Sequence, residues 1–82
     1  MRIFVKFFAL CREAAGQREA ELELPAGSNV RGALERLQEQ YPRLDARCLA
    51  VAVNQEYVEQ ERVLANGDEL ALIPPVSGGN RV

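Results

Sequence analysis

The chain has 82 residues, of which 48% are hydrophobic and 27% charged, and its net charge is −2. This length predicts one domain with a small apolar core, and the absence of a Lys/Arg run argues against nucleic acid or an anionic membrane surface as the main partner. No apolar stretch approaches the roughly 20 residues of a membrane span and the N-terminus lacks a signal-peptide pattern, so we expect a cytoplasmic protein.

The first part of the chain predicts two strands that flank a short helix. Residues 2–8 predict a strand, because β-branched and aromatic residues alternate with two basic ones. Residues 10–15 predict a short helical segment that ends at Gly16. Residues 19–24 alternate strictly between acidic and apolar side chains, as a half-buried strand does.

A longer helix is predicted after a turn at residues 25–27. Ser28 or Asn29 can cap its N-terminus. One apolar stripe then follows at helical spacing, formed by Val30, Ala33, Leu34, Leu37 and Tyr41. Pro42 ends the helix, because proline cannot continue the hydrogen-bond ladder.

The remaining chain predicts three more strands. Residues 49–53 form the first of them, and residues 54–56 form a turn into a short strand around Tyr57-Val58. Residues 66–68, Asn-Gly-Asp, are a strong turn signal, and residues 69–73 form the closing strand. One main helix beside such a set of strands predicts an α+β domain. A mixed sheet of four to five strands packed on that helix is the ubiquitin-like, or β-grasp, arrangement.

The alternation of side chains also predicts an open face of the sheet. One helix covers only one face, and the face with Arg2, Lys6 and Glu69 must be the open one, since unpaired charges are costly to bury. If the first and last strands are neighbours, an apolar patch lies on this face, formed by Phe4, Phe8, Ala71 and Ile73. Such a patch indicates a partner site, and the alternative is that Phe4 or Phe8 lies under a loop or the short helix.

Few residues could carry catalysis. The chain has no histidine and therefore no ready general base near neutral pH. Its two cysteines, Cys11 and Cys48, cannot form a zinc site alone, so we expect no metal site. We interpret them as two free, partly buried thiols, with a disulfide in a reducing compartment as the minor alternative.

The end of the chain has a composition of its own. Pro74-Pro75 stop the last strand, and Gly78-Gly79 follow near the C-terminus. We predict a domain over residues 1–75 and a flexible tail over residues 76–82. Fully extended, residues 74–79 would span roughly 20 Å, enough to enter the active site of another protein, and glycine without Cβ can pass through a narrow channel. The alternative is an inert terminus that happens to contain glycines.

Four groups of residues occur together in this chain. They are Phe7-Phe8-Ala9 followed by Arg12-Glu13, the Ala52-Val53-Asn54-Gln55 turn with Val58, Asn66-Gly67-Asp68-Glu69, and Pro74-Pro75-Val76-Ser77-Gly78-Gly79. Together they resemble the small, sulfur-carrier subunit of molybdopterin synthase over residues 1–79. The Pro-Pro-Val-Ser-Gly-Gly ending is the most specific element of the resemblance.

The resemblance implies a sulfur carrier that is not an enzyme on its own. In that family an activating enzyme related to that of ubiquitin adenylates the terminal glycine with ATP, and a sulfur donor enzyme converts the adenylate to a thiocarboxylate. The tail then enters the large synthase subunit and donates sulfur to cyclic pyranopterin monophosphate, in molybdenum cofactor biosynthesis. The carrier binds no cofactor directly, since ATP is used by the activating enzyme.

The resemblance also assigns roles by position in the matching motifs. Gly79 would carry the acyl-adenylate and the thiocarboxylate, and Gly78 would let the tail thread into the partner. The partner-binding residues would be Phe8, Tyr57, Ile73, Pro75, Val76 and Ser77.

The chain departs from the family in its last three residues, Asn80-Arg81-Val82, because members of the family end at the second glycine. An amide at Gly79 cannot be adenylated as a carboxylate can. Three explanations are open: a peptidase trims the tail after Gly79, the three residues are an artificial extension, or this chain is only a binding module.

Two further functions stay open as alternatives. One is a related carrier, either of the thiamine type or a ubiquitin-like protein modifier, although the Pro-Pro-Val-Ser spacer and the length favour the molybdopterin branch. The other is a β-grasp binding module with an inert tail.

Overall fold

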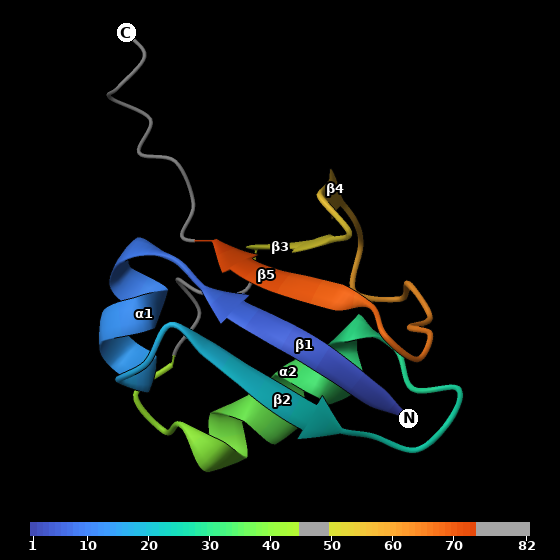
Figure 1. Ribbon diagram of the computed structural model, residues 1–82, viewed down its shortest axis with the longest axis horizontal. Coiled ribbons are helices and arrows are strands. Elements are labelled where there is room, and N and C mark those ends of the chain that lie inside the picture. The colour runs from blue at the N-terminus through green and yellow to red at the C-terminus, as the bar shows by residue number, and fades with distance from the viewer. Residues whose placement is uncertain (45–49, 74–82) are drawn as a thin grey trace, which may run out of the picture.

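The computed structural model describes residues 1–44 and 50–73, which form two layers. Five strands make one sheet, and the longer helix crosses one of its faces, while the short helix lies at one end (Figure 1). The elements are β1 (Arg2–Phe7), α1 (Ala9–Ala15), β2 (Glu19–Glu23), α2 (Val30–Gln40), β3 (Ala50–Val53), β4 (Glu56–Tyr57) and β5 (Glu69–Ile73). The predicted α+β class, with a mixed sheet on one main helix, is confirmed.

The first and last strands are neighbours at the centre of the sheet. The strand order is β2-β1-β5-β3-β4, in which β1 and β5 are parallel and the other pairs are antiparallel. In the parallel pair, Val5 lies beside Leu70 and Phe7 beside Leu72, and all four side chains are buried. The prediction of the apolar patch required the first and last strands to be neighbours, and they are.

The ends of the helices follow local rules. Gly16 ends α1 with a φ of 79°, in the left-handed region that glycine adopts without strain. The Asn29 side chain caps α2 by accepting a hydrogen bond of 3.0 Å from the amide of Gly32. Ser28 has another role, because its hydroxyl donates to the carbonyl oxygen of Pro25 at 2.7 Å. Of the two predicted caps, Asn29 is the one used.

Some predicted boundaries shift by one residue. The first strand ends at Phe7 and not at Phe8, because Ala9 has a φ of 50° and turns the chain into α1. The predicted turn at residues 54–56 is shorter, since Glu56 already pairs with Val53 in β4. Leu49, the predicted start of the third strand, lies outside the described residues.

The core lies between α2 and the sheet. Its members come from both layers and include Ile3, Val5, Leu22, Val30, Leu34, Leu37, Leu64, Leu70 and Leu72. The rings of Phe7 and Tyr41 meet edge to face, with their centroids 5.5 Å apart. This contact joins the end of β1 to the residue that follows α2.

The interpretation of Cys11 as a free, partly buried thiol is wrong. α1 turns its side chain inward, where it is fully buried and disulfide-bonded. The sequence argument inferred free thiols from the expected reducing compartment. It could not say which side chains the fold brings within bonding distance. Cys48 lies outside the described residues.

Candidate functional site

The open face of the sheet carries the charges that the alternation predicted. In β1, Ile3, Val5 and Phe7 point into the core, whereas Arg2 and Phe4 are exposed. The predicted apolar patch lies on the same face. Its two aromatic members, Phe4 and Phe8, are 43% and 46% exposed, so neither is covered by a loop or by α1.

A hollow of about 260 Å³ lies on this face, where β1, β3, β4 and β5 meet. We call it the open-face hollow, and its lining residues are Lys6, Phe8, Ala52, Gln55, Tyr57, Glu69, Ala71 and Ile73. The predicted partner-binding residues Phe8, Tyr57 and Ile73 come from three separate segments, and the fold brings all three into this hollow. Ile73 is the last residue of β5, so this strand ends at the hollow.

The hollow exists because small side chains face each other on neighbouring strands. Ala52 of β3 lies opposite Ala71 of β5 and is only 5% exposed. Larger side chains surround this pair. One of them is Tyr57 of β4, which pairs with Ala52 across the other edge of β3 and is 75% exposed. A small apolar floor with an aromatic rim is the form of surface that a partner's side chain can fill.

An ion pair borders the hollow. The ammonium nitrogen of Lys6 on β1 lies 2.8 Å from a carboxylate oxygen of Glu69 on β5. The hydrogen bond and the charge of Glu69 raise the pKa of Lys6. Within the described residues, Lys6 therefore already has a carboxylate partner. Only the pairing of β1 with β5 could have revealed this.

The turn between β3 and β4 is tied to the start of β5. The Asn54 side chain donates to Asp68 and accepts from the amide of Glu69, both at 3.0 Å, and the amide of Asn54 donates to the carbonyl oxygen of Glu69 at 2.8 Å. The second carboxylate oxygen of Asp68 accepts from the amide of Ala65 at 2.8 Å. These bonds hold the β3–β4 hairpin, and with it Tyr57, in place beside β5.

This network predicts a pH dependence of stability. The hydrogen bond from the amide of Ala65, and then that from Asn54, lower the pKa of Asp68. A lowered pKa stabilises the fold above the pKa of the unfolded chain, and the stabilisation is lost as pH falls through the folded value. We expect the chain to unfold at a higher temperature than Asp68→Asn near neutral pH, and the difference to shrink in acid. Thermal unfolding of both proteins between about pH 6 and pH 2 measures it.

The control for this prediction is Glu13→Gln. It removes a carboxylate of α1 that is exposed. The unfolding temperatures of wild type and Glu13→Gln should differ little at any pH. A difference between wild type and Asp68→Asn that stays constant across the range would contradict the prediction.

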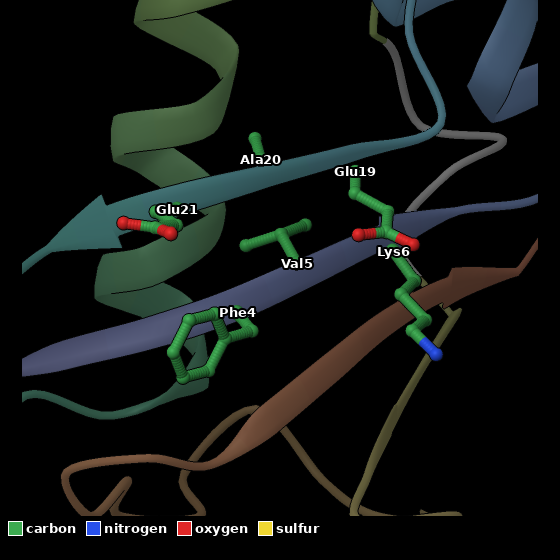
Figure 2. Close-up of a pocket in the computed structure, with 6 residues that line it drawn as sticks. All are labelled: Phe4, Val5, Lys6, Glu19, Ala20 and Glu21. Carbon is green, nitrogen blue, oxygen red and sulfur yellow. The ribbon is translucent and has the colours of Figure 1, made fainter.

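A second hollow, of about 330 Å³, lies between β1 and β2. Figure 2 shows its lining, with Phe4 and Lys6 from β1 and two carboxylates, Glu19 and Glu21, from β2. Glu21 also lies 3.6 Å from Arg2, and the acidic side chains of β2 are exposed, as expected for the solvated side of a strand. Of the residues that the sequence predicted for partner contact, this hollow contains Phe4 of the apolar patch and none of those that the resemblance assigned.

The predicted tail, residues 76–82, lies outside the described residues, and so does Pro75, the last residue of the predicted domain. Among the predicted site residues, this concerns Pro75, Val76, Ser77, Gly78 and Gly79. Their roles stay predictions, as do those of Phe8, Tyr57 and Ile73, whose positions alone are now known. Neither α1 nor α2, the helices of the described part, has the length and apolar character of a membrane span.

Sequence comparison finds close relatives. The model of the ThiS family matches residues 5–79. A molybdopterin synthase sulfur carrier subunit from Chlamydomonas reinhardtii is 41% identical, and the alignment covers 96% of this chain and 100% of that protein. The subunit of the same name from Arabidopsis thaliana is 37% identical, with 96% of this chain and 84% of that protein covered.

A solved structure is also similar. SAMP1, the small archaeal modifier protein 1 of Haloferax volcanii, superimposes with a TM-score of 0.86 at 34% identity, over 96% of this chain and 100% of that one. This likeness confirms the ubiquitin-like β-grasp fold. Since the family model covers most of the sequence and the relatives match along nearly its whole length, the chain belongs to the ThiS family, in which it resembles the molybdopterin synthase sulfur carrier subunits.

Proposed function

We propose that this protein is the sulfur-carrier subunit of a molybdopterin synthase and that Gly79 carries the sulfur. The observation that supports it most is the open-face hollow, which gathers Phe8, Tyr57 and Ile73 at the point where β5 ends. A partner seated in this hollow would have the Gly78-Gly79 segment within reach. The matched span of the family model also runs to Gly79.

The chemistry follows from a free carboxylate on Gly79. Its oxygen attacks the α-phosphorus of ATP in the activating enzyme, and pyrophosphate leaves. A donor enzyme then supplies sulfur at the oxidation level of sulfide, which attacks the acyl carbon of the adenylate and displaces AMP, so that a thiocarboxylate forms. In the large synthase subunit the thiocarboxylate donates its sulfur to cyclic pyranopterin monophosphate, and the carboxylate is regenerated. In a chain that continues to Val82, a peptidase that cleaves after Gly79 would supply the reactive end.

The carrier would meet its partners one after another. The activating enzyme and the large subunit both need the tail, and both would use the same hollow beside its base. Since one hollow accommodates one partner at a time, the two complexes exclude each other. The protein itself supplies the attachment point and the docking surface, while the partners supply the catalytic groups.

Docking in the open-face hollow is tested by Tyr57→Ala. Tyr57 is 75% exposed in the free chain, so its truncation should leave thermal stability unchanged. If it lies in the centre of the interface, affinity for the large subunit should fall by roughly 30-fold, as for a buried aromatic anchor. Isothermal titration calorimetry with the large subunit from the same organism measures the change.

The matched control is Val63→Ala. Val63 is an exposed apolar side chain, at 60%, and does not line the hollow. Its truncation should change affinity by less than about twofold. Equal affinities for Tyr57→Ala and Val63→Ala would argue against this docking surface.

A protein modifier is the second candidate, because SAMP1 has the same fold at 34% identity. The two functions differ in the acceptor of the activated glycine. A carrier loses sulfur to a pterin and keeps its own free terminus, whereas a modifier forms an amide bond with a lysine of another protein. Gel analysis of cell extracts for lysine conjugates of the chain separates them.

A further inference from the structure

Backbone strain in this protein is concentrated around the open-face hollow. Among the described residues, three that are not glycine have positive φ: Ala9 at 50°, Asn54 at 51° and Gln55 at 73°. Ala9 directly follows Phe8, and the other two form the turn that leads into the strand with Tyr57. Strained residues persist where the surroundings or the function demand them.

Asn54 has a clear structural reason to be strained. Asparagine tolerates the left-handed region better than most residues, and its side chain makes the hydrogen bonds to Asp68 and Glu69 described above. Asn54 occupies the first position of a two-residue hairpin turn, where such turns favour asparagine.

Gln55 has no such reason. Val53 pairs with Glu56, so Gln55 is the second residue of a two-residue loop in which both residues have positive φ. Hairpin turns of this kind strongly favour glycine at the second position, because a residue with a Cβ is strained there. The Gln55 side chain is exposed and lines the open-face hollow, and among the described lining residues it alone carries a side-chain amide.

We propose that Gln55 is a specificity-determining residue, whose side-chain amide pairs with a backbone peptide group of the large-subunit segment that occupies the hollow. This inference depends on the proposed function. The alanine floor and aromatic rim can accommodate many apolar side chains, so they do not fix the register of the bound segment. A side-chain amide can donate to a carbonyl and accept from an N–H, so it can fix the register of one particular segment. The backbone strain is retained because glycine would remove this group.

The test compares Gln55→Gly with Gln55→Ala. Glycine relieves the strain, so Tm should rise by about 4 °C, while the dissociation constant for the large subunit should increase about tenfold. Alanine keeps the stiff turn but has no side-chain amide. Its dissociation constant should therefore also increase about tenfold, without a loss of Tm. Thermal unfolding and isothermal titration calorimetry give both values.

The remaining outcomes separate this inference from the proposed function. Normal binding by Gln55→Ala with weak binding by Gln55→Gly would overturn the inference, because turn stiffness and not the side-chain amide would then matter. So would a lower Tm for Gln55→Gly, or normal binding by both variants while Tyr57→Ala binds weakly. If Tyr57→Ala binds normally as well, the docking surface in the proposed function is itself refuted.

Discussion

A chain that ends at Ser77 should transfer no measurable sulfur, yet it should unfold at the same temperature as a chain that ends at Gly79. Loss of two residues moves the terminal carboxylate back by about 7 Å along an extended tail. Since a misplacement of about 1 Å can cost a hundredfold in rate, the activating enzyme could no longer use it. Folding should not change, because the buried side chains of the described core run from Ile3 to Leu72.

Intact-mass spectrometry after incubation with the activating enzyme, ATP and the sulfur donor measures the loss. The chain that ends at Gly79 should exchange one carboxylate oxygen for sulfur, and the chain that ends at Ser77 should keep its mass. The full chain to Val82 provides a second comparison, since it also lacks a carboxylate on Gly79. Absence of sulfur loading in all three chains would favour a protein whose tail is inert.

Leu70→Ala should remove a large share of the stability. Leu70 is fully buried on the central strand β5, between Val5 of β1 and Val53 of β3, which are buried as well. The cavity and the lost apolar burial should lower the free energy of unfolding by about 3 kcal/mol. A domain of this size has only about 4–12 kcal/mol in total, so Tm should fall by about 15 °C. Urea unfolding followed by circular dichroism measures the change.

Leu10→Ala is the matched control, because it makes the same chemical change on the surface. Leu10 lies in α1 and is 47% exposed. The free energy of unfolding should change by less than about 0.5 kcal/mol. Similar losses for the two variants would contradict the central position of β5.

Local rules explain how much of the fold the sequence predicts. Strand alternation depends on neighbours two residues apart, and helix caps depend on three or four residues, so both can be read along the chain. The end of α1 at Gly16 and the closing strand β5 were predicted in this way, and the cap of α2 was narrowed to Ser28 or Asn29, of which Asn29 is used. The open face followed from the same alternation. The sequence places Lys6 and Glu69 on one face of the sheet, and it would be costly to bury that face if these charges were unpaired.

The candidate site was predictable only in part. Phe8 and Ile73 belong to the open face by alternation, whereas Tyr57 was assigned by resemblance alone. Ala52 and Gln55 were missed as lining residues. An alanine that forms the floor of a hollow has no sequence signal, because the hollow depends on Ala71 of another strand lying opposite it. The strain at Gln55 has a weak signal, since a glutamine stands where the hairpin turn favours glycine.

The sequence by itself therefore determined the elements, their buried faces and the motifs of the tail, because each depends on chemistry within a few residues. Only the tertiary structure decided which strands are neighbours. The parallel pairing of β1 with β5 brings together residues more than 60 positions apart, and it creates the Lys6–Glu69 ion pair and the open-face hollow. The tertiary structure also decided that Cys11 is buried and disulfide-bonded. Such contacts arise from packing the whole core, in which many distant side chains must fit at once, and no local pattern encodes them.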